Sequence, residues 1–218
     1  MPSLIEDYAL VGDGHTAALI SRDGSIDWLC WPRFDSGACF AALLGTAQNG
    51  RWLLTPDTDA PPTVTRRYRG DTLILETDYE CAQGAVTVID FMPPGNGWSE
   101  LVRIVIGRRG NVPMKMELVL RFDYGFSVPW VSRLKHDNGV KAIVGPDTAV
   151  LRTPVKLHGE NMRTVATFSV AEGERVPFAL AYAPSHLRVP PARDPFTSLA
   201  RTENYWLEWA ARSTVQGK

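Results

Sequence analysis

The segment Trp31-Pro32-Arg33-Phe34-Asp35 combines residue types that could bind a sugar. Flat aromatic rings stack on sugar faces, and the side chains of Arg33 and Asp35 can fix the positions of hydroxyl groups. Pro32 interrupts the preceding strand pattern, so we expect a shaped loop, where binding residues tend to lie. The alternative is structural: Trp31 and Phe34 would pack in the core or at a domain interface, with Arg33 paired to Asp35.

A second candidate is Asp13-Gly14-His15. The imidazole of His15 could bind a sugar or exchange a proton near neutral pH. More often a histidine in such a setting caps a turn or hydrogen-bonds to the backbone, and we favour that interpretation. Asp13 and His15 are both kept as candidate contact residues.

The sequence gives no support for a metal or cofactor site. Cys30, Cys39 and Cys81 are odd in number and have no metal-ligand spacing, which favours buried free thiols in a reducing compartment. The remaining histidines are far apart, and none has a partner four residues away. A glycine-rich phosphate loop is also missing. We therefore predict no metal and no cofactor.

Composition narrows the possible partners. A chain of 218 residues, 44% of them hydrophobic, is long enough for one sizeable core. The 23 Lys and Arg residues are balanced by 24 Asp and Glu, which argues against nucleic acid or an anionic membrane as a partner. Acidic residues near the N-terminus do not fit a signal peptide, and no apolar run approaches the roughly 20 residues of a membrane span. We expect a cytoplasmic protein.

The elements that would position these residues are mostly short strands separated by turns. Asp23-Gly24 is typical of a two-residue type I′ hairpin, here between Ala17–Ser21 and Ser25–Trp31. About a dozen such strands predict a mainly β fold, an antiparallel β-sandwich. The further expected strands are Gly50–Thr55, Thr63–Arg69, Thr72–Glu80, Ala85–Met92, Glu100–Arg108, Met114–Phe122, Val140–Val144, Ala149–Thr153, Arg163–Val170 and Val176–Ala183.

Two helices are expected beside the strands. Ser36 could cap a short helix over Gly37–Leu44, and Gly45 would end this helix in a left-handed conformation. Asp194 and Pro195 are suited to the N-cap and first turn of a longer C-terminal helix.

The C-terminal helix has an apolar stripe that includes Phe196 and Trp206. Trp206 and Trp209 together are more than a small sandwich normally leaves exposed. We therefore expect Phe196, Trp206 and Trp209 to dock this linker helix against a further surface. The chain divides into a β-sandwich domain, residues 1–190, and a linker helix, residues 191–218.

Two stretches carry a resemblance to a known family. They are GDGHTAALISRDGSIDWLCWPRFDS (Gly12–Ser36) and ACFAALLG (Ala38–Gly45). They resemble the start of bacterial glucoamylase- and trehalase-like enzymes of glycoside hydrolase family 15. The resemblance implies an N-terminal β-sandwich of the supersandwich kind. A helical (α/α)6 barrel would follow it and carry two catalytic glutamates for an inverting mechanism.

On this resemblance the chain is expected to end before the barrel and to contain no catalytic residue. Its partner would be the missing catalytic domain of the same polypeptide, which it would pack against. Through the parent enzyme the substrate would be an α-glucosidic oligosaccharide or trehalose. The expected rim or interface residues are Asp13, His15, Trp31, Arg33, Phe34 and Asp35.

Two functions of other classes remain open. In one, the chain is a stand-alone carbohydrate-binding module in which Trp31, Trp98 and Trp130 form a stacking platform. In the other, it is a structural domain that forms a homo-oligomer through its exposed helix and a sheet face.

Overall fold

The chain folds into antiparallel strands with a helix near its C-terminus, as a computed structural model describes it for residues 4–95, 97–135 and 137–213. The strands of the first part are β1 (Ala9–Gly12), β2 (Ala17–Ile20), β3 (Ser25–Cys30), β4 (Ala38–Phe40), β5 (Arg51–Pro56), β6 (Thr63–Tyr68), β7 (Leu75–Cys81) and β8 (Gly84–Phe91). Those that follow are β9 (Glu100–Val119), β10 (Trp130–Arg133), β11 (Gly139–Val144), β12 (Asp147–Arg152), β13 (His158–Glu160), β14 (Arg163–Ala171) and β15 (Arg175–Pro184). Short 3-10 turns are η1 (Ile5–Asp7), η2 (Ala42–Leu44), η3 (Ala47–Asn49) and η4 (Asp123–Gly125), and the α-helix is α1 (Pro195–Ala210).

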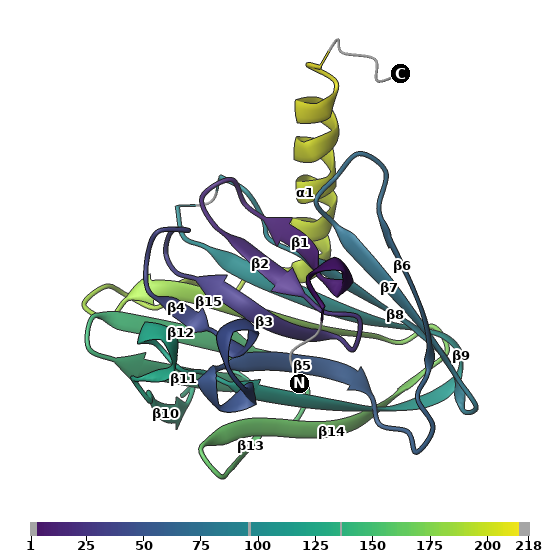
Figure 1. The fold of residues 1–218 in the computed structure, drawn as a ribbon, viewed down its shortest axis with the longest axis horizontal. Helices are drawn as coiled ribbons and strands as arrows, with labels where there is room; N and C mark the ends of the chain where they lie inside the picture. Colours follow the sequence, from purple (N-terminus) through teal and green to yellow (C-terminus); the bar gives the residue numbers. More distant parts are fainter. Residues whose placement is uncertain (1–3, 96, 136, 214–218) are drawn as a thin grey trace.

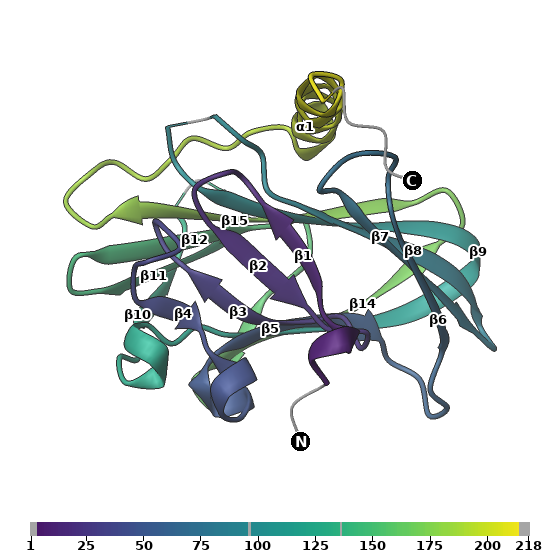
Figure 2. The ribbon, with the colours of Figure 1, turned by 45° about the horizontal axis from the view of Figure 1, so that its top comes forward.

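Strand β9 joins two layers of the sheet (Figures 1 and 2). Its first half pairs with β8 and β15, in a layer ordered β6-β7-β8-β9-β15-β12-β11-β10. Its second half pairs with β5 and β14, in a layer ordered β1-β2-β3-β5-β9-β14-β13, with β4 on β3. The predicted mainly β, antiparallel sandwich is therefore confirmed.

The main core lies between these layers. Val88 and Leu101 of one layer and Trp52 and Met114 of the other belong to a single buried cluster. Because successive side chains of a strand point to opposite faces, neighbours such as Phe91 form a second cluster on the outer face, beneath α1. The central strand β8 is consequently buried along its whole length.

The prediction of two strands over Glu100–Arg108 and Met114–Phe122 was wrong, because β9 runs through both without a break. Residues 108–111 are exposed, and Gly110 has a left-handed φ of 68°, so this stretch looks like a turn in sequence. It is instead the place where β9 passes from one layer to the other. Here Gly110 pairs with Gly84 of β8, and Asn111 pairs with Ala171 of β14.

The short helix predicted over Gly37–Leu44 was also wrong. Residues 38–40 form β4, which is buried and paired with β3, and only a 3-10 turn follows. The hydroxyl of Ser36 accepts a hydrogen bond from Arg33 N at 3.2 Å and caps no helix, while Gly45 has a φ of −156°. Burial and strand pairing outweigh the weak helical preference of a segment this short.

The hairpin at Asp23-Gly24 has three loop residues where two were predicted. Ser21 N donates to Ser25 O at 2.8 Å, and of the loop residues Gly24 has the positive φ, 84°. A type I′ turn needs positive φ at two positions, whereas a three-residue loop needs it at the last one. The side chain of Asp23 stabilises the turn by accepting a hydrogen bond from Ser25 N.

Helix α1 begins as predicted. The Asp194 carboxylate accepts hydrogen bonds from the backbone N–H and the hydroxyl of Thr197, and Pro195 follows at the first turn. The helix lies on the outer face of the β8–β9–β15 layer (Figure 2), and its C-terminal turns extend past the sheet (Figure 1). In the part of the chain that the structure describes, no helix is both long and apolar enough to cross a bilayer.

Candidate functional site

The two candidate segments lie side by side at one corner of the sandwich. Phe34 N donates to His15 O at 3.1 Å, and Thr16 Oγ1 donates to Cys30 O at 2.7 Å. We call residues 13–15 and 31–36 the corner loops. They connect β1 to β2 and β3 to β4, respectively.

A buried chain of hydrogen bonds supports the corner loops from below. Trp31 Nε1 donates to Ser99 Oγ at 2.9 Å, and Ser99 Oγ donates to Asp13 Oδ2 at 2.8 Å. The other carboxylate oxygen of Asp13 accepts from the backbone N–H groups of His15 and Thr16, each at 2.9 Å. Trp31 is 3% exposed and Asp13 is 6% exposed. Trp31 and Asp13 therefore hold the corner loops in place. Sequence reasoning missed Ser99, which links these two side chains.

Of the candidate contact residues, His15, Arg33, Phe34 and Asp35 are exposed to solvent. The Phe34 ring is 72% exposed, and Arg33 holds Asp35 through two hydrogen bonds of 3.0 and 3.1 Å. Hydrolysis of a glycosidic bond needs one acidic and one basic carboxyl group on either side of the bond. Because Asp13 is buried and Asp35 is paired, the corner loops offer contact surface without such a pair.

The tryptophans of the proposed stacking platform have three different environments. Trp31 is buried and packs its ring 5.9 Å from that of Tyr182, so it cannot present a face to a ligand. The guanidinium of Arg193 lies 4.1 Å from the centre of the Trp98 ring. Trp130, on β10, is 78% exposed.

The linker helix differs from expectation at one tryptophan. Phe196 packs against the outer cluster of the sandwich, and Trp206 is buried within this chain, although it was expected to be exposed. Trp209 remains 56% exposed, with its ring edge-on to Trp206 at 5.9 Å. The surface left for docking at the end of α1 therefore consists of Trp209 with its exposed neighbours Tyr205 and Leu207.

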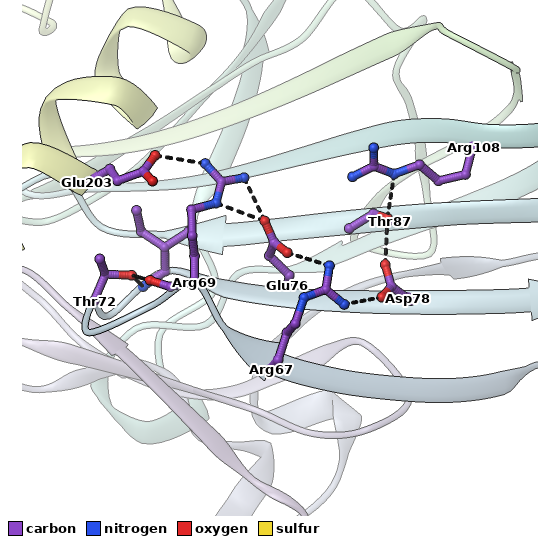
Figure 3. A network of polar contacts seen from close by, with 9 residues as sticks. Arg67, Arg69, Thr72, Glu76, Asp78, Thr87, Arg108 and Glu203 are labelled. Carbon is purple, nitrogen blue, oxygen red and sulfur yellow. Dashed lines mark hydrogen bonds and ion pairs between the residues drawn. The ribbon is translucent and has the colours of Figure 1, made fainter.

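A network of charges fixes α1 to the outer face of the sheet (Figure 3). Glu203 of the helix pairs with Arg69 at 3.0 Å, and Arg69 pairs with Glu76 at 2.6 Å. Glu76 also binds Arg67, which continues the network to Asp78.

Beyond Asp78 the network crosses β8. Thr87 donates to Asp78 at 2.6 Å and accepts from Arg108 at 2.8 Å. Burial opposes ionisation of Asp78, but the hydrogen bonds from Thr87 and Arg67 outweigh it, so the pKa of Asp78 is lowered. The outer face of these strands is thus occupied by internal contacts.

The interior contains an ion pair that sequence reasoning missed. Arg103 has no exposed surface, and its Nε donates to Asp90 Oδ1 at 2.8 Å. Its other nitrogens donate to the carbonyl oxygens of Trp52 and Gly24 in the opposite layer, both at 2.8 Å. Arg103 therefore connects the two layers through polar contacts inside the core.

Glu100 is the second buried ionisable residue of interest. It is 4% exposed, and its Oε2 has no hydrogen-bond partner among the described residues. Burial raises its pKa despite the charges of Arg193 and Arg152. The residue lines a cavity of about 670 Å³ beside the connector to α1. The other carboxyl group in the lining is that of Asp137, which pairs with Arg152, so the cavity does not present two free carboxyl groups for hydrolysis.

Metal-binding groups do not gather in the described residues, where no three His, Cys, Asp or Glu side chains could hold an ion together. The three cysteines are free. Cys30 and Cys39 are buried, and burial raises the pKa of both thiols.

Comparison with known proteins gives a family match over nearly the whole chain. A family model described as "Trehalase-like, N-terminal" matches residues 1–206. A trehalase of Mycobacterium tuberculosis is 28% identical over 94% of this chain and 33% of its own length. A trehalase of Thermoplasma volcanium is 22% identical over 98% of this chain and 35% of its own length. The chain thus spans about a third of the length of the curated relatives that it matches.

A putative kojibiose phosphorylase from the human microbiome superposes with a TM-score of 0.36 at 10% identity, covering 94% of this chain and 33% of the other.

Proposed function

Because the chain belongs to the trehalase-like N-terminal domain family, we propose that it is the non-catalytic β-sandwich of an inverting, cytoplasmic α-glucoside hydrolase of glycoside hydrolase family 15. Its role is to pack against the catalytic part of that enzyme and to form one wall of the substrate cleft. The observation that supports this most is the family match over residues 1–206, in a chain one third as long as its trehalase relatives. The names of these relatives favour trehalose as the substrate. Maltose, a substrate of the glucoamylase kind, is the alternative.

The corner loops are the part of the domain that we assign to the substrate cleft. Their backbone is held by Asp13 and Trp31 from within, so the exposed Phe34 ring has a fixed base. A binding residue needs this kind of support, because affinity falls when a side chain must be ordered on binding. Arg33 and Asp35 add polar groups beside the ring.

A stand-alone carbohydrate-binding module is supported less well. Such a module needs several aromatic rings on one surface. Of the three tryptophans considered, Trp31 is buried and Trp98 lies under Arg193. Trp130 alone is largely exposed among these three.

The primary test compares glucose release from trehalose and from maltose by the 218-residue chain and by the product of its full reading frame. We expect activity in the longer protein and none in the chain. Activity of the chain by itself would contradict the proposal, as would a longer protein inactive on both sugars.

The assignment of the corner loops is tested by Phe34→Ala in the longer protein. We expect KM to rise several-fold with little change in thermal stability, since the ring is exposed. Leu187→Ala is the matched control, because Leu187 is also exposed and lies outside the corner loops. Equal KM values for both variants would remove Phe34 from the cleft.

A further inference from the structure

The two layers of the sandwich separate at one end and leave a groove of about 720 Å³ between them. Figure 1 shows the flanking strands β10 and β13 at the lower left, away from α1. Members of the main core, including Leu118, Leu120, Val140 and Leu157, line this end groove. The end groove therefore reaches down to the hydrophobic core, whose residues there remain buried.

Large apolar side chains stand at the mouth of the end groove. Trp130 is 78% exposed and Met162 is 76% exposed, and Val128 and Val131 are about half exposed. Trp130 belongs to β10, which in the described residues pairs with β11 on one side and is otherwise a sheet edge. A soluble domain rarely leaves an apolar surface of this kind uncovered.

The guanidinium groups of the end groove contact neighbouring residues, although Nε of Arg163 has no hydrogen-bond partner among the described residues. Arg121 donates to the carbonyl oxygens of Leu120 and Met162, at 2.7 and 3.2 Å, and Arg133 donates to Leu157 O at 3.3 Å. Arg163 pairs with Glu117. The main-core residues and the exposed Trp130 and Met162 make most of this lining apolar, which suits apolar protein side chains better than the hydroxyls of a sugar.

The charged side chains of the end groove indicate a second property of any surface that covers it. Arg163 is paired with Glu117. Within the described part of the chain, however, the guanidinium groups of Arg121 and Arg133 contact only backbone carbonyl oxygens, and the end groove sets them against the single carboxylate of Glu160. A surface that covers the groove is therefore favoured when it has acidic groups around an apolar centre.

The end groove also adjoins the corner loops. Strand β4, which follows the second corner loop, contacts η4. The chain then runs from η4 through the exposed Phe126 to Val128 and Trp130 of the groove. One covering surface could reach both regions.

We propose that the end groove receives apolar side chains, flanked by acidic residues, from the catalytic part of the same polypeptide. The proposal rests on the function proposed above and names the surface through which this domain docks. The match covers only about a third of the relatives' length, so the remaining length of such a polypeptide would supply enough chain for this contact. The outer face of the β8–β9–β15 layer is already covered by α1 and its charge network.

The test measures backbone hydrogen exchange in the 218-residue chain and in the full-length protein. We expect slower exchange in the full-length protein at β10 and at the β13–β14 hairpin. Trp130→Asp should remove this protection and lower the Tm of the full-length protein by several degrees more than that of the chain. Ile5→Asp is the matched control, because Ile5 is 72% exposed and lies in η1.

A second variant keeps the test valid if Trp130→Asp does not fold. Asn161 and Met162 form the two-residue turn of the β13–β14 hairpin with φ values of 48° and 59°, where glycine is favoured over methionine. Met162→Gly should therefore leave the chain as stable or more stable, yet reduce protection of β10 in the full-length protein.

Three results would overturn the inference. Unchanged exchange at β10 and the hairpin in an active full-length protein would refute the docking surface and leave the proposed function intact. A dimer of the full-length protein that Trp130→Asp dissociates would assign the groove to a second copy. Protection of the chain by trehalose or maltose, lost in Trp130→Asp, would assign it to a sugar.

Discussion

At the scale of single residues, the buried Arg103–Asp90 pair makes the core sensitive to substitution. Removing one partner of a buried pair leaves the other charge without compensation, at a cost of about 3–5 kcal/mol. We expect Arg103→Met to lower the free energy of unfolding by this amount in urea denaturation, since it also strands the carbonyl oxygens of Trp52 and Gly24. Arg109→Met, which breaks an exposed pair with Glu80, should cost at most about 1 kcal/mol. Similar losses in both variants would contradict this assignment.

Glu100 should make stability depend on pH. Its pKa is raised in the folded state above the ordinary value of 4.5, so over the interval above pH 4.5 the folded state binds more protons than the unfolded state. Stability conferred by the protonated carboxyl is therefore lost as pH rises through this interval. We expect the stability of Glu100→Gln, relative to the wild type, to increase from pH 4 toward neutral pH. Urea titrations of both proteins at several pH values measure this difference in the free energy of unfolding. A difference that does not change with pH would contradict the role of Glu100.

At the scale of elements, the two tryptophans of α1 should behave differently in the isolated chain. Trp206 is buried and Trp209 is exposed, so Trp206→Ala should cost about 3 kcal/mol and Trp209→Ala no more than about 0.5 kcal/mol. Thermal or chemical unfolding of the chain measures both. If Trp209 contributes to docking, its substitution should lower the stability of the full-length protein alone. Equal effects of the two substitutions on the chain would contradict the burial of Trp206.

The sequence predicted those elements whose signals are local. Asp194 and Pro195 define the start of α1 through a cap and a fixed φ, and alternation identified β7 and β8. It failed at β9, where Gly107 and Gly110 look like a turn but carry the strand between layers. It failed again at β4, which is a strand because β3 pairs with it. Both errors concern pairing with other strands, which the residue preferences of a single segment do not show.

In the candidate site, too, local features could be predicted from the sequence and contacts with other elements could not. The sequence singled out the two corner loops from their residue types, and the structure shows that they are neighbours. It could not say which of their side chains are buried, because the burial of Trp31 depends on Ser99 and Tyr182, far away in the chain. The end groove has no local signal at all, since it arises where β10 and the β13–β14 hairpin separate.

At the scale of the whole molecule, β9 should make the sandwich unfold as one unit. Its halves belong to different layers, and Arg103 ties both layers together from within. Neither layer can lose β9 without exposing the shared core, which predicts two-state unfolding. We expect tryptophan fluorescence and far-UV circular dichroism to give the same urea midpoint. Val105→Ala in the first half and Val112→Ala in the second should each shift both signals together, because both side chains belong to the main core. Separate midpoints, or a variant that shifts one signal alone, would show that the layers unfold independently.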